Sequence, residues 1–333
     1  MQPQFSASKR EEVASKPLPA LWQNKQFILL LCAYTLSLFG NSFHSIALNL
    51  WVLTKTGSAK MMTIVLVTNL VISSLLGPIA GTIADRMNRR KIMLISDLVR
   101  CGFVFTIALC ITLPKVPFIL IVFLTGIVTA SGLFHSPAFH ASLVNIVGKE
   151  HLQRATGLLN ISDNISRTVG FAVGGIFVTT FGGAWAIVFD GFSFLVSFLL
   201  VLIAGTFSSP NIEKHHQKKF KEDLMTGFRY IWKDPFAKSV TILSPTLILF
   251  FMSSLMLTQV MAVKVWKASP FHFGLIEACI PLGYMLGAGI IVALGEKIKK
   301  RGKLVMLNLI LMGPFTSFFH ILRRHPSPFP SFF

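Results

Sequence analysis

Two pairs of opposite charges lie inside long apolar segments of the chain, where a charge is costly to keep. Asp97 and Arg100 are three residues apart, and Asp163 and Arg167 are four apart. At either spacing the two side chains share one face of a helix. A charge at the middle of a bilayer costs about 2.5–3.5 kcal/mol on insertion scales, so such residues commonly belong to proton relays or substrate pathways. The alternative is that each pair neutralises itself and serves folding.

Two further carboxylates stand in apolar segments without an opposite charge nearby in the same segment. They are Asp190 and Glu277. A lone buried carboxylate has no local partner to offset the loss of water, so a functional role is more strongly indicated for these two than for the pairs. His135 and His140 are five residues apart and do not share a helix face, so they are interpreted as polar cavity or interface residues rather than metal ligands.

The segments that must position these residues are long enough to cross a membrane. The chain is 53% hydrophobic and 13% charged, whereas soluble domains carry about 25% charged residues. Continuous apolar runs without alternation favour helices over a barrel. We therefore expect an all-α membrane protein with nine spans: Phe27–Leu53, Met61–Ile83, Ile92–Leu113, Val116–Ala138, Gly157–Phe181, Trp185–Phe207, Val240–Val263, Phe271–Leu294 and Leu304–Leu322.

The basic residues predict the orientation of these spans. With the N-terminus inside, 22 Lys and Arg residues lie in inner segments and 5 in outer loops, which is the positive-inside pattern. The net charge of +18 is thus attributed to topology, and no nucleic acid partner is expected. The predicted divisions are an inner tail (1–26), a six-helix half (27–207), a central inner loop (208–239), a partial second half (240–322) and an atypical tail (323–333).

The central loop contains apolar residues at helical spacing among lysines. These are Phe220, Leu224, Phe228 and Ile231. The pattern predicts an amphipathic helix that lies on the inner membrane surface. Asp234-Pro235 should end it, because the residue before a proline disfavours helical geometry.

The loop after the second span carries a recognisable motif. Gly81 is followed, after three residues, by Asp85-Arg86, and Arg89-Arg90 comes next. This motif resembles the loop signature of the major facilitator superfamily, and further stretches between Leu21 and Leu311 resemble its macrolide-efflux and enterobactin-exporter branch. The resemblance implies a gate that holds the inner side closed, with the arginines pairing across to the other half. The alternative is that they only enforce orientation.

The fifth span adds a second resemblance. Gly170, Gly174 and Gly175 resemble the antiporter-type glycine motif of that superfamily, without its usual proline, and small residues four apart permit close helix crossing. The fourth-span arginine of the family is missing between Thr125 and His140, and Asn41 stands where many relatives carry Asp.

The resemblance implies a secondary transporter that exports a small molecule, such as a drug, a macrolide-like compound or a siderophore, by alternating access. Its energy source would be the proton gradient, with no cofactor. The expected setting is a bacterial inner membrane, with the protein monomeric and its N-terminus cytoplasmic. Because spans five and eight are neighbours in that fold, Arg167 is the expected partner of Glu277. Glu277 would bind a proton when the pair opens, since burial without a partner disfavours the charged carboxylate.

Three alternatives remain open at the level of sequence. An importer of a small solute would share the same fold, and a non-transporting membrane protein would share the same composition. An enzyme is the most distant, because no nucleophile, metal cluster or phosphate-binding loop is present. Nine spans place Arg323 and Arg324 outside, against the charge rule. We therefore expect a truncated coding sequence that lacks three of twelve helices.

Overall fold

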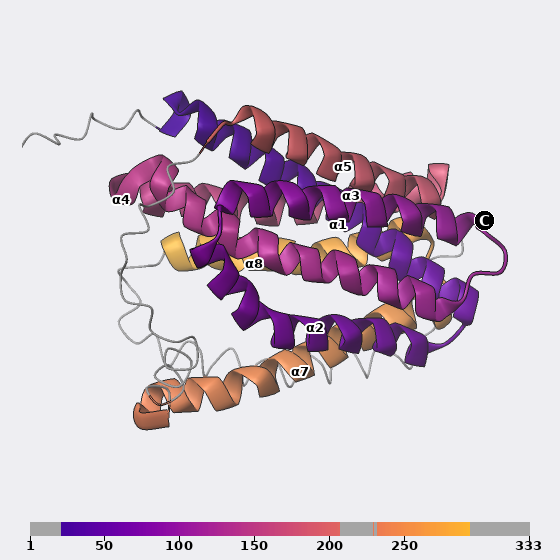
Figure 1. Ribbon diagram of the computed structural model, residues 1–333. Coiled ribbons are helices and arrows are strands. Elements are labelled where there is room, and N and C mark those ends of the chain that lie inside the picture. Colours follow the sequence, from indigo (N-terminus) through magenta and orange to yellow (C-terminus); the bar gives the residue numbers. More distant parts are fainter. Residues whose placement is uncertain (1–20, 207–228, 230–231, 294–333) are drawn as a thin grey trace, which may run out of the picture. The chain divides into compact units, whose positions relative to one another are not determined.

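A computed structural model describes residues 21–206, 229 and 232–293, and the elements among them are helices (Figure 1). A short 3-10 turn, η2 (Leu21–Gln23), precedes the first long helix. The long helices are α1 (Lys25–Thr56), α2 (Ala59–Arg86), α3 (Arg89–Thr112), α4 (Phe118–Phe181), α5 (Gly183–Ile203), α7 (Pro235–Lys264) and α8 (Pro270–Ala293). The expected all-α class is therefore confirmed.

Six of these helices are long and apolar enough to cross a membrane: α1, α2, α3, α4, α5 and α8. α7 contributes a shorter apolar stretch, Ile248–Lys264. The nine expected spans are thus not confirmed as a count. The ninth, Leu304–Leu322, lies outside the described residues, as do the apolar residues of the predicted surface helix (Phe220, Leu224, Phe228 and Ile231) and the tail 323–333.

α4 corrects the expected boundaries of the fourth and fifth spans. Residues 139–156 were expected to form an inner loop, but they are helical, and the chain bends instead at Gly148. A straight helix of 64 residues would be about 96 Å long, three times the ~30 Å hydrocarbon core. The bend folds the chain back, so that residues on both sides of Gly148 contact neighbouring residues of α1. Phe139, before the bend, stacks on Tyr34, and Ser162, after the bend, hydrogen-bonds Thr35.

Gly148 occupies a backbone conformation that other residues avoid, with φ 71° and ψ 167°. We expect Gly148→Ala to destabilise the folded protein by about 1–3 kcal/mol, the cost of holding a side chain in that region. Gly157→Ala is the matched control, because Gly157 is helical and a Cβ there meets nothing within 4 Å. The control should be more stable than the parent chain by about 0.5–1 kcal/mol, because alanine has a higher helix propensity than glycine. Melting temperatures of the purified variants compare the two, and equal shifts would contradict the role of Gly148.

Several helices begin at residues suited to capping a helix. Asn24 precedes α1 and accepts from Phe27 N at 3.2 Å, and Asn88 precedes α3 and accepts from Lys91 N at 3.2 Å. Asp234 precedes Pro235 at the start of α7, and its side chain accepts from Ala237 N at 3.4 Å. These side chains satisfy backbone N–H groups that have no partner inside the helix. Asp234 itself is not helical, so the predicted helix break at Asp234-Pro235 is confirmed.

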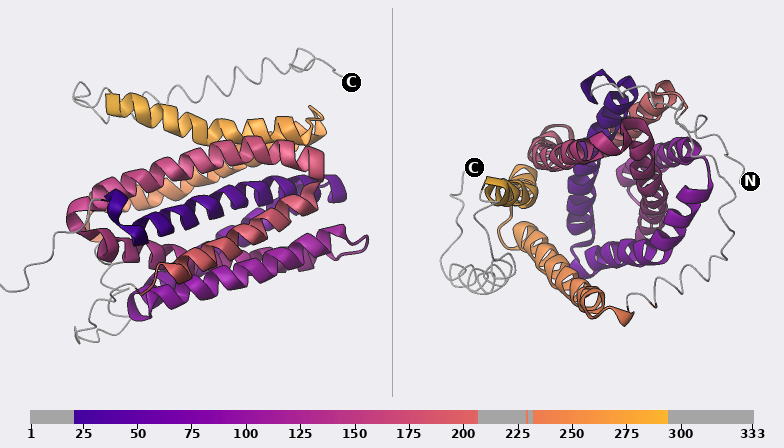
Figure 2. Two further views of the ribbon diagram at one scale, coloured as in Figure 1. Left: turned by 90° about the horizontal axis from the view of Figure 1, so that it is seen from above. Right: turned by 90° about the vertical axis from the view of Figure 1, so that its left-hand side faces the viewer.

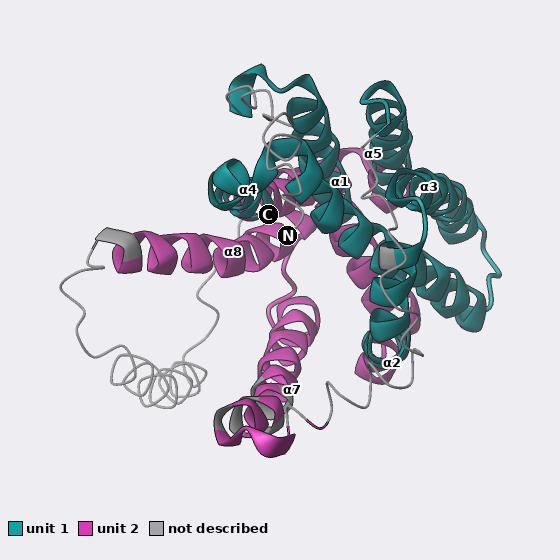
Figure 3. Cartoon of the chain, turned by 60° about the vertical axis from the view of Figure 1, so that its left-hand side comes forward, with its two compact units in different colours: residues 1–41, 64–163, 187–216 teal, residues 42–63, 164–186, 217–333 magenta. Residues whose placement is uncertain are grey.

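The chain divides into two compact units (Figure 3). Unit 1 comprises residues 1–41, 64–163 and 187–216, and unit 2 comprises the rest. Within unit 1, α3 and α5 lie side by side, and the first part of α1 lies against α5 (Figure 2). The core of unit 1 includes Phe27, Met93 and Phe139. That of unit 2 includes Ile46 of α1, Ala262 of α7 and Phe273 of α8.

Large apolar side chains also cover the outside of the described helices. Leu75 of α2, Ile119 of α4 and Leu199 of α5 are among the exposed ones. A soluble monomer rarely exposes an apolar surface on this scale. Lipid is the solvent that such helices suit, in agreement with an integral membrane protein.

Candidate functional site

A buried cluster of polar side chains in unit 1 centres on Asp97 of α3. Asp97 is 0% exposed. Its Oδ2 accepts a hydrogen bond of 2.7 Å from Ser197 Oγ of α5. Its Oδ1 lies 3.5 Å from His135 Nε2 of α4 and 3.9 Å from an Arg100 nitrogen on its own helix. Three helices therefore converge on one carboxylate.

Arg100 has several neighbours besides Asp97. One of its terminal nitrogens donates to Asn41 Oδ1 of α1 at 3.4 Å, and its guanidinium carbon lies 3.8 Å from the centre of the Phe194 ring. It also interacts electrostatically with both Asp97 and Asp190. A guanidinium over an aromatic face is attracted by the ring quadrupole. Arg100 is thus held by several weak contacts rather than by one tight ion pair.

Asp190 of α5 completes the cluster from the side of α1. It is 1% exposed, and Ser193 Oγ lies 3.3 Å from its Oδ1. A Cβ on Gly40 would be 2.7 Å from the same oxygen, so a glycine is needed at that position. Asp190 therefore lies against Gly40, the residue before Asn41, and Asn41 contacts Arg100.

Three of the buried polar atoms at the centre of this cluster lack a hydrogen bond. They are Asp97 Oδ1, His135 Nε2 and Arg100 Nε. Buried polar atoms in proteins are nearly always paired, so each exception needs an explanation. Asp97 Oδ1 and His135 Nε2 face each other at 3.5 Å without forming a hydrogen bond, and a terminal nitrogen of Arg100 lies 3.9 Å from the same Oδ1. The arrangement is suited to gaining a proton or exchanging partners.

The arginines of the loop motif lie at a different place in unit 1. Arg89 donates to Ala141 O of α4 at 2.8 Å, and Arg90 donates to Leu202 O near the end of α5 at 2.8 Å. Leu202 lies in the last turn of α5, where carbonyls have no partner in the helix and cations are favoured, whereas Ala141 lies inside α4. In this structure both arginines therefore bind the N-terminal half. The predicted gate across the two halves stays a prediction for Gly81, Asp85, Arg86, Arg89 and Arg90.

Replacing Arg89 tests whether its hydrogen bond to Ala141 O stabilises the N-terminal half. We expect Arg89→Ala to lower the stability by about 1.5 kcal/mol, because a hydrogen bond from a charged donor is lost at a half-buried site. Arg86→Ala is the matched control, since Arg86 is exposed on the same motif. A gate role without bracing would reverse the pattern, with normal melting of purified Arg89→Ala and impaired transport in both variants.

Glu277 of α8 belongs to unit 2 and has a polar partner on α7. It is 6% exposed, and its Oε1 accepts from Gln259 Nε2 at 2.7 Å. Among the described residues its carboxylate hydrogen-bonds Gln259 rather than Arg167, which is exposed on α4. The pairing of Glu277 with Arg167, and that of Arg167 with Asp163, stay predictions.

The glycines of α4 lie where helices of unit 2 approach closely. A Cβ on Gly174 would be 3.3 Å from side-chain atoms of Phe43 and Ile46 of α1, and one on Gly175 would be 2.6 Å from Pro270 O of α8. Gly274 of α8 faces Gly175 in turn. Gly170 is buried on the same helix. The backbones of α4 and α8 therefore touch at paired glycines.

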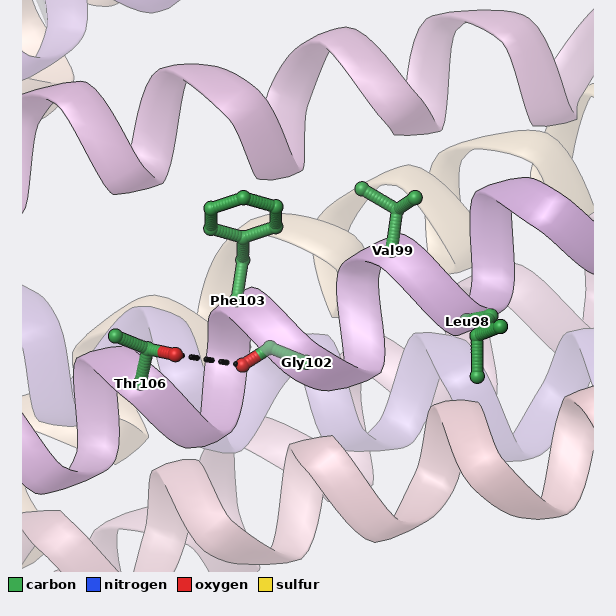
Figure 4. Close-up of a pocket in the computed structure, with 5 residues that line it drawn as sticks. All are labelled: Leu98, Val99, Gly102, Phe103 and Thr106. Atoms are coloured by element: carbon green, nitrogen blue, oxygen red, sulfur yellow. Dashed lines mark hydrogen bonds between the residues drawn. The ribbon is translucent and has the colours of Figure 1, made fainter.

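A shallow depression on α3 does not compete with the charged cluster as a site. It is lined by five residues of this single helix: Leu98, Val99, Gly102, Phe103 and Thr106 (Figure 4). The Thr106 hydroxyl donates to Gly102 O within the helix at 2.9 Å. At about 100° per residue, Leu98, Val99, Gly102 and Thr106 lie at least about 100° around the helix from both Asp97 and Arg100, and Phe103 lies about 60° from Arg100. The depression thus lies on the apolar outer side of α3.

Sequence reasoning found part of this cluster and missed part. Asp97, Arg100 and Asp190 were selected as candidates, and the structure brings them together. His135 was interpreted only as a polar cavity or interface residue, and Asn41 only as a departure from the family pattern. One available signal was the spacing of Asp190, Ser193 and Ser197, which places three polar groups on one face of an apolar helix. Within the described residues, no three His, Cys, Asp or Glu side chains gather as metal ligands.

Comparison with known proteins identifies relatives over most of the chain. A family model described as Major Facilitator Superfamily matches residues 30–326. Macrolide efflux protein A of Streptococcus pyogenes is 23% identical over 295 residues, which cover 88% of this chain and 72% of the relative. The enterobactin exporter EntS of Shigella boydii is 28% identical over 223 residues, covering 63% of this chain and 49% of the relative. The match thus spans about half the length of that exporter.

Proposed function

Because this chain belongs to the Major Facilitator Superfamily, we propose that it exports a small molecule across a bacterial plasma membrane by alternating access, driven by the proton gradient. Membership places the chain among integral membrane transporters rather than enzymes. The direction of transport is proposed from the relatives, which are named as an efflux protein and an exporter. That agreement in direction, between two otherwise different relatives, is the observation that carries the proposal.

The proposed substrate is an amphipathic molecule of the macrolide or siderophore type. The relatives carry those names, and at 23–28% identity the substrate-contacting side chains are free to differ. The proposed orientation places the N-terminus in the cytoplasm, as the Lys and Arg distribution predicts. The protein is proposed to act as a monomer, with lipid and substrate as its partners and no cofactor.

The buried charges of unit 1 support proton coupling. Intramembrane carboxylates and histidines are the groups that proton-driven transporters use as relays. Asp97, His135 and Asp190 are half-buried or buried around one arginine. Binding and release of a proton there would change the charge of helices that have to move against each other during alternating access.

Accumulation assays in a drug-sensitive bacterial host test the function. Cells that express the chain are loaded with radiolabelled erythromycin or with enterobactin, and retained label is followed after glucose is added. We expect at least about threefold lower retention than in cells with the empty vector, and the difference should vanish when a protonophore collapses the gradient. Higher retention in expressing cells would identify an importer, and retention equal to the vector for both probes would contradict export of these two classes.

A further inference from the structure

We propose that Asp97 and His135 together hold the single proton that couples transport, and that Arg100 is the cation that displaces it. This proposal rests on the proposed proton-driven export and assigns it to particular atoms. It places coupling in unit 1, on α3 and α4, rather than on Glu277 of α8, the carboxylate that the sequence favoured.

The geometry of the pair leaves room for one proton. Asp97 Oδ2 is satisfied by Ser197, whereas Oδ1 has no hydrogen bond and faces His135 Nε2 at 3.5 Å. His135 Nε2 has no hydrogen bond either. With the imidazole hydrogen on Nδ1, the Nε2 of neutral His135 only accepts, as a carboxylate oxygen does. In that tautomer, one added proton on either atom turns the pair into a donor and an acceptor and satisfies both.

The charges of the groups around Asp97 and His135 also indicate that the pair binds one proton. The titratable groups that face it are Arg100 and Cys101 from α3, His135 and its neighbour His140 from α4, and Asp190 from α5. From α1 the facing polar residue is Asn41, which does not titrate. Two carboxylates and one guanidinium leave a net charge of −1 when both histidines are neutral. One bound proton makes this buried cluster neutral, which its low-dielectric surroundings favour.

Arg100 is placed to exchange with the proton. Its terminal nitrogens contact Asn41 at 3.4 Å and Asp97 at 3.9 Å, and the Phe194 ring lies beneath the guanidinium. A short movement toward Asp97 brings a full positive charge against Oδ1, and the proton then leaves the pair for water. A movement back toward Asn41 and Asp190 exposes Oδ1 again, and a proton from water replaces the lost charge. In the first half an O–H or N–H bond of the pair breaks and an O–H bond forms on water. In the second half an O–H bond on water breaks and an O–H or N–H bond forms on the pair.

Glu277 differs from this pair in the state of its hydrogen bonds. Its Oε1 accepts from the Gln259 amide at 2.7 Å, whereas Asp97 Oδ1 accepts none. Gln259 does not titrate, and no Lys or Arg forms an ion pair with Glu277 among the described residues. A proton bound at Glu277 would therefore lack the exchanging cation that Arg100 supplies to Asp97.

Infrared difference spectroscopy on the purified chain tests the proton site without any substrate. Spectra are recorded in detergent over a pH titration, and the C=O stretch of a protonated carboxyl and the imidazole ring modes are followed. We expect a coupled carboxyl–imidazole signal in the parent chain. Asp97→Asn should remove the carboxyl component, and His135→Gln, which keeps a donor of similar size, should alter that component. His140→Gln is the matched control and should keep the signal, because His140 is an exposed histidine five residues further along the same helix.

Glu277→Gln distinguishes the two candidate carboxylates. If the carboxyl signal disappears in Glu277→Gln and persists in Asp97→Asn, the assignment to Asp97 is overturned. If it persists in both Asp97→Asn and His135→Gln, the pair does not bind the proton. Should Asp97→Asn fail to fold, His135→Gln and Glu277→Gln still decide between the two sites.

Proteoliposomes with radiolabelled erythromycin as the probe separate this proposal from the proposed function. In the parent chain, an imposed pH gradient should drive erythromycin uphill, and Asp97→Asn should reduce that flux at least about tenfold while erythromycin exchange at equal concentrations continues. Loss of exchange as well would indicate a folding or substrate defect and overturn the coupling role. A parent chain that shows the infrared signal but moves no erythromycin contradicts macrolide export and leaves the proton site in place.

Discussion

Replacement of Arg100 by Gln is expected to destabilise the folded protein by about 3–5 kcal/mol, the usual result of removing one partner from a buried ion pair. Asp97 and Asp190 are 0% and 1% exposed, so bulk water cannot replace the arginine as a partner of either carboxylate. The hydrogen bond to Asn41 and the contact with the Phe194 ring would be lost as well. The melting temperature in detergent and the amount of folded protein in membranes measure the effect.

A double substitution checks that charge is the cause. Adding Asp97→Asn to Arg100→Gln removes the charge of Asp97, which Arg100 no longer offsets, so the double variant should be more stable than Arg100→Gln alone. A steric role for the arginine predicts the opposite, that the two losses add. The difference between the single and double variants gives the coupling energy of the pair.

The helices of this protein were largely predictable because lipid imposes a length on each of them. The expected span Phe27–Leu53 lies inside α1 (Lys25–Thr56), and Ile92–Leu113 matches α3 (Arg89–Thr112) to within a few residues. Capping residues such as Asn88 and Asp234 account for where helices start. The length of an apolar run and a few polar residues at its ends therefore predict most of the helix boundaries.

The helical structure around Gly148 was not predicted, although a signal for it was present. Polar residues between 139 and 156 suggested a loop, but Leu143, Ile146 and Val147 recur at helical spacing and are buried in the core of unit 1. Helical spacing of apolar residues inside a polar stretch indicates an amphipathic helix that extends past the membrane core. The bend then falls on the glycine, the one residue type that accepts its dihedral angles.

The assembly of the charged cluster could not be predicted, because the spanning helices are apolar on most of their faces. In water an apolar stripe shows which side of a helix faces inward, but in lipid both sides are apolar. The spacing of Asp97 and Arg100 placed both on one face of α3, and it gave no indication that His135 and Ser197 lie opposite them. Those contacts depend on the rotation of α4 and α5 about their own axes, which only tertiary packing determines.

Replacement of Gly274 by Val is expected to prevent the close crossing of α8 with α4. A Cβ at this position would press on Phe171 O and lie 2.9 Å from the Gly175 Cα, both backbone atoms that have no rotamer with which to move away. Overpacking of this kind usually costs about 1–3 kcal/mol, and a β-branched side chain against backbone should reach the upper end of that range. Folded protein recovered by size-exclusion chromatography and its melting temperature are the readouts.

Gly289→Val is the matched control for this substitution, since Gly289 lies on the same helix and a Cβ there meets nothing within 4 Å. It should insert and melt like the parent chain. If both variants lose stability equally, the effect arises from valine in α8 and not from the crossing. Gly274→Ala then provides a graded step. A chain that still folds but transports erythromycin more slowly would indicate that α4 and α8 slide on these glycines during the transport cycle, because an added methyl obstructs that movement before it prevents folding.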